Sequence, residues 1–89
     1  MTPLQHKILL VMQENHRLGK PKKDMSSVIF EVGMGSEPKT KQEGVRNAIR
    51  TLDEQGWLDS DKSSRPHQYW LKPEFSKTPF SELEISHEG

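Results

Sequence analysis

The stretch from Lys39 to Trp70 constrains the fold more than any other part of the chain, because a helical pattern leads directly into two strand patterns. Four apolar residues recur at the i, i+3, i+4 and i+7 positions that share one helix face, namely Val45, Ala48, Ile49 and Leu52. Gly56 follows them, and glycine suits the left-handed position just past a helix end. The pattern predicts an amphipathic helix over about residues 41–55.

The start of this helix carries a capping signal. Thr40-Lys41-Gln42-Glu43 has the Ser/Thr-x-x-Glu form, in which a hydroxyl and a carboxylate each satisfy a backbone N–H group that the first turn leaves unpaired. We therefore expect Thr40 to be the N-cap.

The face opposite the apolar stripe carries hydrogen-bonding and charged side chains. They are Thr40, Glu43, Arg46, Asn47, Arg50 and Glu54. Arginine, asparagine and threonine are residue types that reach base edges and phosphate oxygens. This face is therefore a candidate nucleic-acid surface.

Two short aromatic runs follow Gly56. Trp57-Leu58 and Gln68-Tyr69-Trp70-Leu71 predict strands, and the segment from Asp59 to Pro66 between them is too polar to be buried. Trp57, Tyr69 and Trp70 could stack on unpaired bases. Burial of Trp57 and of one strand aromatic is the interpretation we prefer, because neighbouring strand residues face opposite sides.

Two further helices are expected before this stretch. Thr2-Pro3-Leu4-Gln5 has an N-cap threonine and a proline at the first helical position, and the helix should end near residues 15–18, before Gly19 and Pro21. One face of this helix carries Leu4, Ile8, Val11, Met12 and Asn15. Leu10 lies off this face and could serve a dimer contact, with ordinary burial as the preferred alternative.

Asp24 is the candidate N-cap of the second helix, and Gly33 is placed to end it. Met25, Val28, Ile29 and Val32 again have helical spacing. The β-branched run Val28-Ile29-Phe30 leaves a strand as the alternative. Residues 20–23 predict a solvated basic connector. The turn over residues 33–39 is longer than that of a tight helix-turn-helix.

The net charge of the 89 residues is zero, which taken alone argues weakly against nucleic-acid binding. The distribution is uneven, because residues 1–72 have a balance of +3 and residues 73–89 have a balance of −3. We expect one domain over residues 1–72 and an acidic tail over residues 73–89. The tail is either solvated or contains a short helix from Thr78, and its terminal position favours the solvated form.

Several classes of function find no support in the sequence. The chain has no cysteine, and its histidines (6, 16, 67 and 87) lack metal-ligand spacing, so we expect no metal and no cofactor. No serine is paired with a base by a recognisable motif, so we expect no enzyme. No apolar run approaches the roughly 20 residues of a membrane span. We expect a soluble, cytoplasmic protein.

Three segments together resemble the winged helix-turn-helix transcriptional regulators of bacterial or phage type. They are Ser27–Met34, Val45–Leu58 with its pattern V-x-x-A-I-x-x-L-x-x-x-G-W-L, and Gln68–Leu71. The resemblance implies an α+β fold of three helices and a β-hairpin wing over residues 59–67. It also implies double-stranded DNA as the partner, with the third helix in the major groove and the wing on the backbone or minor groove.

Carried over by position, the resemblance gives a set of expected DNA-binding residues. They are Lys39, Thr40, Glu43, Arg46, Asn47 and Arg50 on the third helix, and Lys62, Ser63, Ser64 and Arg65 on the wing. Winged helices also bind proteins, so an interaction module with a protein partner or a homodimer is the first alternative. A subunit that binds single strands or replication origins is the second.

Overall fold

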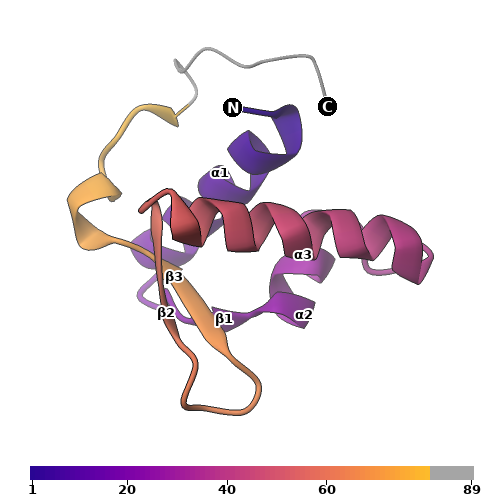
Figure 1. Ribbon diagram of the computed structural model, residues 1–89. Coiled ribbons are helices and arrows are strands. Elements are labelled where there is room, and N and C mark those ends of the chain that lie inside the picture. The colour runs from indigo at the N-terminus through magenta and orange to yellow at the C-terminus, as the bar shows by residue number, and fades with distance from the viewer. Residues whose placement is uncertain (81–89) are drawn as a thin grey trace.

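The computed structural model describes residues 1–80, and over these residues the chain forms a small α+β fold of three helices and a three-stranded antiparallel sheet (Figure 1). The elements in chain order are α1 (Pro3–Arg17), β1 (Lys23–Asp24), α2 (Met25–Glu31), α3 (Lys39–Glu54), β2 (Leu58–Asp61), β3 (Gln68–Leu71) and the 3-10 turn η1 (Pro73–Phe75). None of the helices within residues 1–80 has the length and apolar character needed to cross a membrane.

The first two helices begin as their sequences predict. The Thr2 hydroxyl accepts a hydrogen bond from the Gln5 N–H, and the Thr2 N–H donates to the Gln5 side chain, both at 3.1 Å, which completes a capping box. The Asp24 carboxylate accepts from the Ser27 N–H at 2.8 Å and caps α2. The alternative of a strand at residues 28–30 is wrong, because these residues lie inside α2.

The expected cap of α3 is also wrong. Pro38, with φ −57° and ψ 153°, occupies the N-cap position, and no side chain caps this end. Thr40 already lies within the helix, so its hydroxyl is not placed to bond the N–H groups of the first turn. The Gln42 side chain links α3 to the preceding turn, because its amide donates to the Met34 and Gly35 carbonyls, each at 3.2 Å.

The end of α3 agrees with the sequence. Gly56 has φ +88°, a conformation that side-chain-bearing residues rarely adopt. The Gly56 N–H donates to the Asp53 carbonyl at 3.1 Å and the Trp57 N–H donates to the Leu52 carbonyl at 3.0 Å. These two bonds make a Schellman motif, which turns the chain directly from α3 into β2.

The sheet has the strand order β1-β3-β2, with both pairs antiparallel. The edge strand β1 is not expected from the sequence, which predicts a solvated connector over residues 20–23. The strand β2 also continues to Asp61, so the predicted polar loop from residue 59 is shorter than expected. Polar residues are tolerated in β2 because alternate positions face solvent, and Ser60 donates to the Asp53 carboxylate at 3.2 Å.

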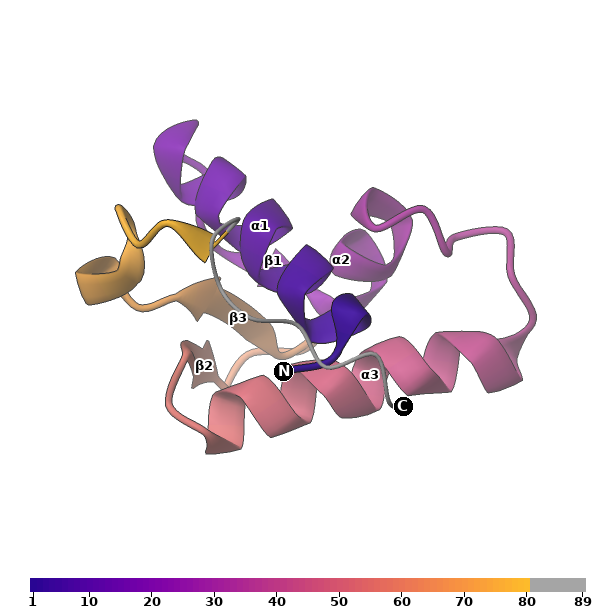
Figure 2. The ribbon, with the colours of Figure 1, turned by 90° about the horizontal axis from the view of Figure 1, so that it is seen from above.

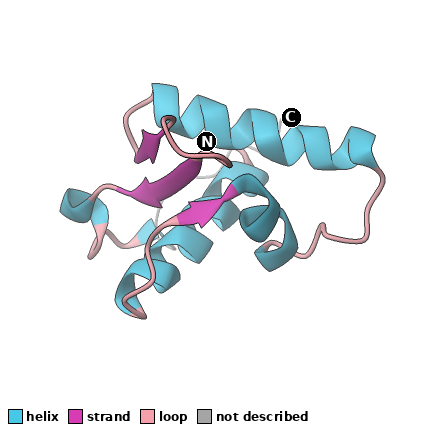
Figure 3. Cartoon of the chain, turned by 90° about the horizontal axis from the view of Figure 1, so that it is seen from below, coloured by secondary structure: helices cyan, strands magenta, loops and turns pink. Residues whose placement is uncertain are grey.

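The core lies between the helices and the sheet. Figure 2 shows α3 along one side of the molecule, with the sheet at its C-terminal end and α1 and α2 on its inner side. Figure 3 shows the same arrangement from below. The fully buried apolar side chains include Ile8, Leu9 and Met12 of α1, Val28 of α2, Val45, Ile49 and Leu52 of α3, and Leu58 and Leu71 of the sheet. Tyr69 is buried as well, whereas Trp70 is half-buried.

Residues 73–80 pack against the body of the protein, so the expected solvated tail is wrong for this part. Phe80 is only 1% exposed, and its ring lies 5.7 Å from the Trp57 ring. The Phe80 carbonyl contacts His6 Nε2, and the Gln13 amide donates to the Thr78 carbonyl at 2.7 Å. The free energy gained by burying the Phe80 ring exceeds the free energy of keeping this short segment in water. The glutamates 82, 84 and 88 of the expected acidic tail lie outside the described residues.

Candidate nucleic-acid interface

The outward face of α3 carries the polar residues that are expected there from the helical spacing. Val45, Ala48, Ile49 and Leu52 are buried, so the helix must turn its opposite side to solvent. Lys39, Thr40, Glu43, Asn47 and Arg50 are exposed, and Arg46 is half-buried at the flank towards α2. Lys39 and Thr40 lie in the first turn, and Asn47 and Arg50 lie nearer the sheet end.

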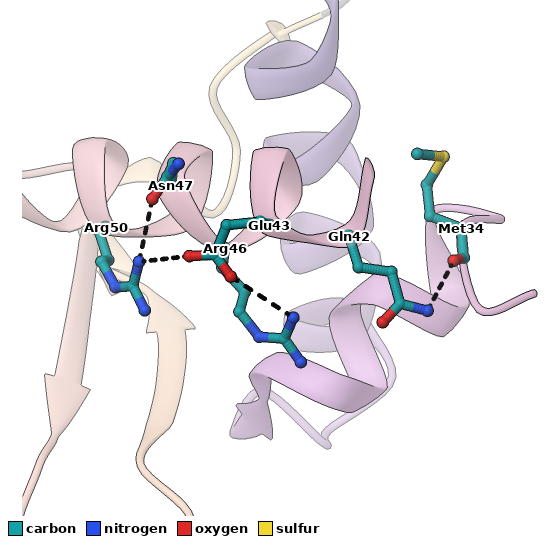
Figure 4. A network of polar contacts seen from close by, with 6 residues as sticks. All are labelled: Met34, Gln42, Glu43, Arg46, Asn47 and Arg50. Atoms are coloured by element: carbon teal, nitrogen blue, oxygen red, sulfur yellow. Dashed lines mark hydrogen bonds and ion pairs between the residues drawn. The ribbon is translucent and has the colours of Figure 1, made fainter. Parts of the chain in front are cut away.

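One carboxylate organises the centre of this face. Glu43 lies between two guanidinium groups, with 3.3 Å between its Oε1 and Arg50 Nη1 and 3.8 Å between its Oε2 and Arg46 Nη1. Arg50 Nη1 also donates to Asn47 Oδ1 at 3.0 Å. Figure 4 shows this network, which spans two turns of α3. Each surface ion pair contributes only about 0–1 kcal/mol, so the network orders these side chains but can be exchanged.

The two arginines extend in different directions from α3. Figure 4 shows Arg50 on the side of the β2–β3 hairpin and Arg46 on the side of α2. Arg46 lines a small depression with Ser26, Phe30, Gly35 and Gln42. Arg50 lines a second depression, of about 350 Å³, together with Ser26, Arg65, His67 and Tyr69. The sequence predicted neither depression.

The tip of the hairpin is held by bonds within its own turn. Asp61 accepts from the Ser63 hydroxyl and, at 3.0 Å, from the Ser63 N–H. The hydroxyl bond is the main reason that the pKa of Asp61 lies below its ordinary value. The Ser64 hydroxyl donates to the Pro66 carbonyl at 3.1 Å. Both serines, expected to contact DNA, therefore shape the tip in the free protein.

The hairpin's two cations differ in their surroundings. Lys62 Nζ lies 3.4 Å from the Asp53 carboxylate, so its side chain reaches back towards α3. Arg65 makes no ion pair within residues 1–80, and its guanidinium lies 3.4 Å from His67 Nε2. Arg50 and Arg65 line the same depression, which Asp24 also lines, so the helix and the hairpin present two cations to one site beside a carboxylate that caps α2. We refer to Arg46, Asn47, Arg50, Lys62 and Arg65 as the α3–hairpin face.

Three residues that lie next to the α3–hairpin face are not indicated by the sequence. Ser26 lines both depressions, His67 lies beside Arg65, and Gln42 fixes the turn before α3. The spacing of Ser26 and Phe30, four residues apart on α2, could have indicated a second exposed helix face next to α3. Nothing in the sequence pointed to His67, because its position depends on the path of the hairpin.

Most polar groups of this face are cations or hydrogen-bond donors. Within the part of the chain that the structure describes, no group of three or more histidine, cysteine or acidic residues is close enough to hold a metal ion. Guanidinium, ammonium and amide donors on a convex helix beside a hairpin can bind an anionic polymer. Comparisons of the chain with protein-family models, with curated proteins and with solved structures found no match.

Proposed function

We propose that this chain is a winged-helix protein that binds double-stranded DNA, as small transcriptional regulators do. In this proposal α3 enters the major groove, and the hairpin tip between β2 and β3 lies along the backbone or the minor groove. The α+β architecture is compatible with a winged helix, because the hairpin follows directly on α3 and extends away from its C-terminal end (Figure 1).

The observation that carries the proposal is the shared depression of Arg50 and Arg65. It joins the exposed face of the helix to the hairpin, so both elements can contact one duplex at once. Asn47 and Arg50 are exposed near the middle of α3, where base edges would be closest. Asparagine and arginine pair with adenine and guanine edges in the major groove, while cations on the hairpin contact phosphates.

Duplex DNA is favoured over single strands by the positions of the aromatic residues. Tyr69 is buried in the core, and Trp57 packs against Phe75 with ring centroids 4.9 Å apart. Trp70 is half-buried, and the Lys22 ammonium lies 5.1 Å from its ring centroid. Single-strand binders stack successive bases on several exposed aromatic rings, whereas Phe30 is the one fully exposed ring within residues 1–80.

A protein partner is the second candidate function, and Phe30 is the observation that favours it. This ring is 76% exposed on α2, beside the Arg46 depression. An exposed aromatic residue next to an arginine is typical of the residues that dominate protein interfaces. Loss of partner binding in Phe30→Ala, with duplex binding unchanged, would support this second function.

A titration with labelled nucleic acid tests the proposal. Fluorescence anisotropy would be measured with a random-sequence duplex of 20 base pairs and with one of its strands, at 50 mM and 200 mM salt. If four or five cations contact phosphates, the salt slope of about −0.9 per contact weakens duplex binding by roughly 10²–10³-fold between these salt concentrations. We expect the single strand to bind less tightly than the duplex.

A pair of double variants locates the binding face. Arg50→Ala with Arg65→Ala removes two cations from the α3–hairpin face. Arg17→Ala with Lys77→Ala removes two from a separate depression between α1 and residues 76–78. We expect duplex affinity to fall strongly in the first pair and little in the second. Equal losses, or no duplex binding by the wild type at 50 mM salt, would contradict the proposal.

A further inference from the structure

We propose that Glu43 determines specificity in the α3–hairpin face. It acts as an internal counter-ion, and its displacement by a duplex is unfavourable unless a matching base donates a hydrogen bond to the released carboxylate. The inference rests on the proposed duplex binding and adds to it a reason why duplexes without a matching base should bind less tightly. The matching base is a cytosine, whose N4 amino group donates to a carboxylate in the major groove.

The geometry gives Glu43 a position that no other acidic residue of residues 1–80 shares. Its two carboxylate oxygens each face a different arginine, at residue spacings of three and seven along α3. Asp53 pairs with Lys62 and accepts from Ser60, and Glu54 makes no ion pair with another described residue. Glu43 alone therefore neutralises the two arginines of α3 together.

Both arginines must change partners when a duplex binds. A phosphate oxygen can replace the Glu43 carboxylate at Arg46, and a guanine edge or a phosphate oxygen can replace it at Arg50, because surface ion pairs are weak and exchangeable. The released carboxylate would then lie within a few ångströms of the negatively charged backbone without a cation. That placement is unfavourable on any duplex that offers it no hydrogen-bond donor.

A cytosine at the matching position removes this penalty. Its N4 amino group is the donor that the major-groove edge of a C·G pair offers to an acidic side chain, whereas guanine and thymine present carbonyl oxygens. Adenine has an amino group too, but beside its N7 acceptor it suits an amide better than a carboxylate. Glu43 therefore lowers affinity for duplexes in general and lowers it least for those with a correctly placed C·G pair.

The test compares Glu43→Gln with Glu54→Gln. Both variants remove one negative charge from exposed positions of α3, but only the first removes a carboxylate that bridges arginines. Glu43 has a side chain that is 52% exposed, so both variants should fold, and thermal melts would verify this. Anisotropy titrations would use a random-sequence 20-base-pair duplex pool at 100 mM salt.

We expect Glu43→Gln to bind the random pool roughly tenfold more tightly than the wild type, since two surface ion pairs no longer have to be broken when the arginines contact a duplex. Glu54→Gln should change this affinity less than about threefold by the same reasoning. Selection from the pool should recover a fixed C·G pair with the wild type and with Glu54→Gln. With Glu43→Gln that position should become variable.

Other results would overturn the inference. Equal gains in duplex affinity in the two variants would show that net charge alone matters. Weaker duplex binding by Glu43→Gln than by the wild type would show that the carboxylate assists binding to all duplexes. Retention of the C·G preference in Glu43→Gln would exclude the cytosine contact. Each of these leaves duplex binding by the wild type intact, whereas a wild type that binds no duplex would refute the proposed function together with this inference.

Discussion

Replacement of Phe80 by alanine tests whether the C-terminal segment is part of the folded body. Phe80 is 1% exposed and lies edge-on to Trp57, so the change removes a buried ring and leaves a cavity. Such Phe→Ala changes cost about 3–5 kcal/mol of unfolding free energy. A domain of 89 residues has a total of roughly 4–13 kcal/mol, at about 0.05–0.15 kcal/mol per residue. The variant should therefore lose roughly a quarter or more of its stability.

The assay is urea unfolding, followed by tryptophan fluorescence and by far-ultraviolet circular dichroism. Phe30→Ala is the matched control, because it deletes the same ring from a site that is 76% exposed. We expect the control to change the unfolding free energy by no more than about 0.5 kcal/mol. The Tm of Phe80→Ala should fall by roughly 12–40 °C, at about 4–8 °C per kcal/mol. A loss below about 1 kcal/mol would show that residues 73–80 do not contribute to the core.

Three further predictions concern substitutions of single residues. Asp24→Ala should cost about 0.5–2 kcal/mol at pH 7, measured by urea unfolding, because it removes the cap of α2. The Ser27 N–H bond lowers the pKa of Asp24 below 3.8, so this carboxylate stabilises the fold above pH 3.8. Its contribution is lost as the pH falls through the lowered pKa, and an Asp24→Ala cost that stays constant down to pH 2 would contradict the cap. Gly56→Ala should cost about 1–2 kcal/mol in thermal melts, because the backbone there has φ +88°, although the nearest atom to the added Cβ is 3.9 Å away; an unchanged Tm would contradict this. In anisotropy titrations, Asn47→Ala should cost about 1–3 kcal/mol at a preferred duplex and relax its sequence preference, whereas Lys62→Ala should weaken all duplexes alike. The reverse pattern would place the hairpin, not α3, against the bases.

Features that depend on neighbouring residues were predicted well from the sequence. The capping box of Thr2 and Gln5, the cap at Asp24 and the left-handed Gly56 follow from contacts within a few residues. The apolar stripe of α3 is equally local, since helical spacing determines which side chains share a face. The Thr40 cap failed because Pro38 took the N-cap position two residues earlier.

Features that depend on distant residues were not predicted. Lys23 and Asp24 form a strand only because Tyr69 and Gln68 pair with them, and a two-residue strand has no periodicity of its own. The docking of Phe80 depends on Trp57 and on His6 at the other end of the chain. At the candidate site, the sequence supplied Glu43, Arg46 and Arg50, but their shared ion pairs required the side-chain positions.

The central claim is that the α3–hairpin face contacts duplex DNA, and amide chemical-shift mapping tests it most directly. Uniformly ¹⁵N-labelled protein would be titrated with a random-sequence duplex of 20 base pairs at 50 mM salt. We expect the largest shift changes at Arg46, Asn47 and Arg50 and at residues 62–65, with small changes along the outer side of α1. Changes concentrated at Arg17 and Lys77, or no changes at saturating duplex, would contradict the account.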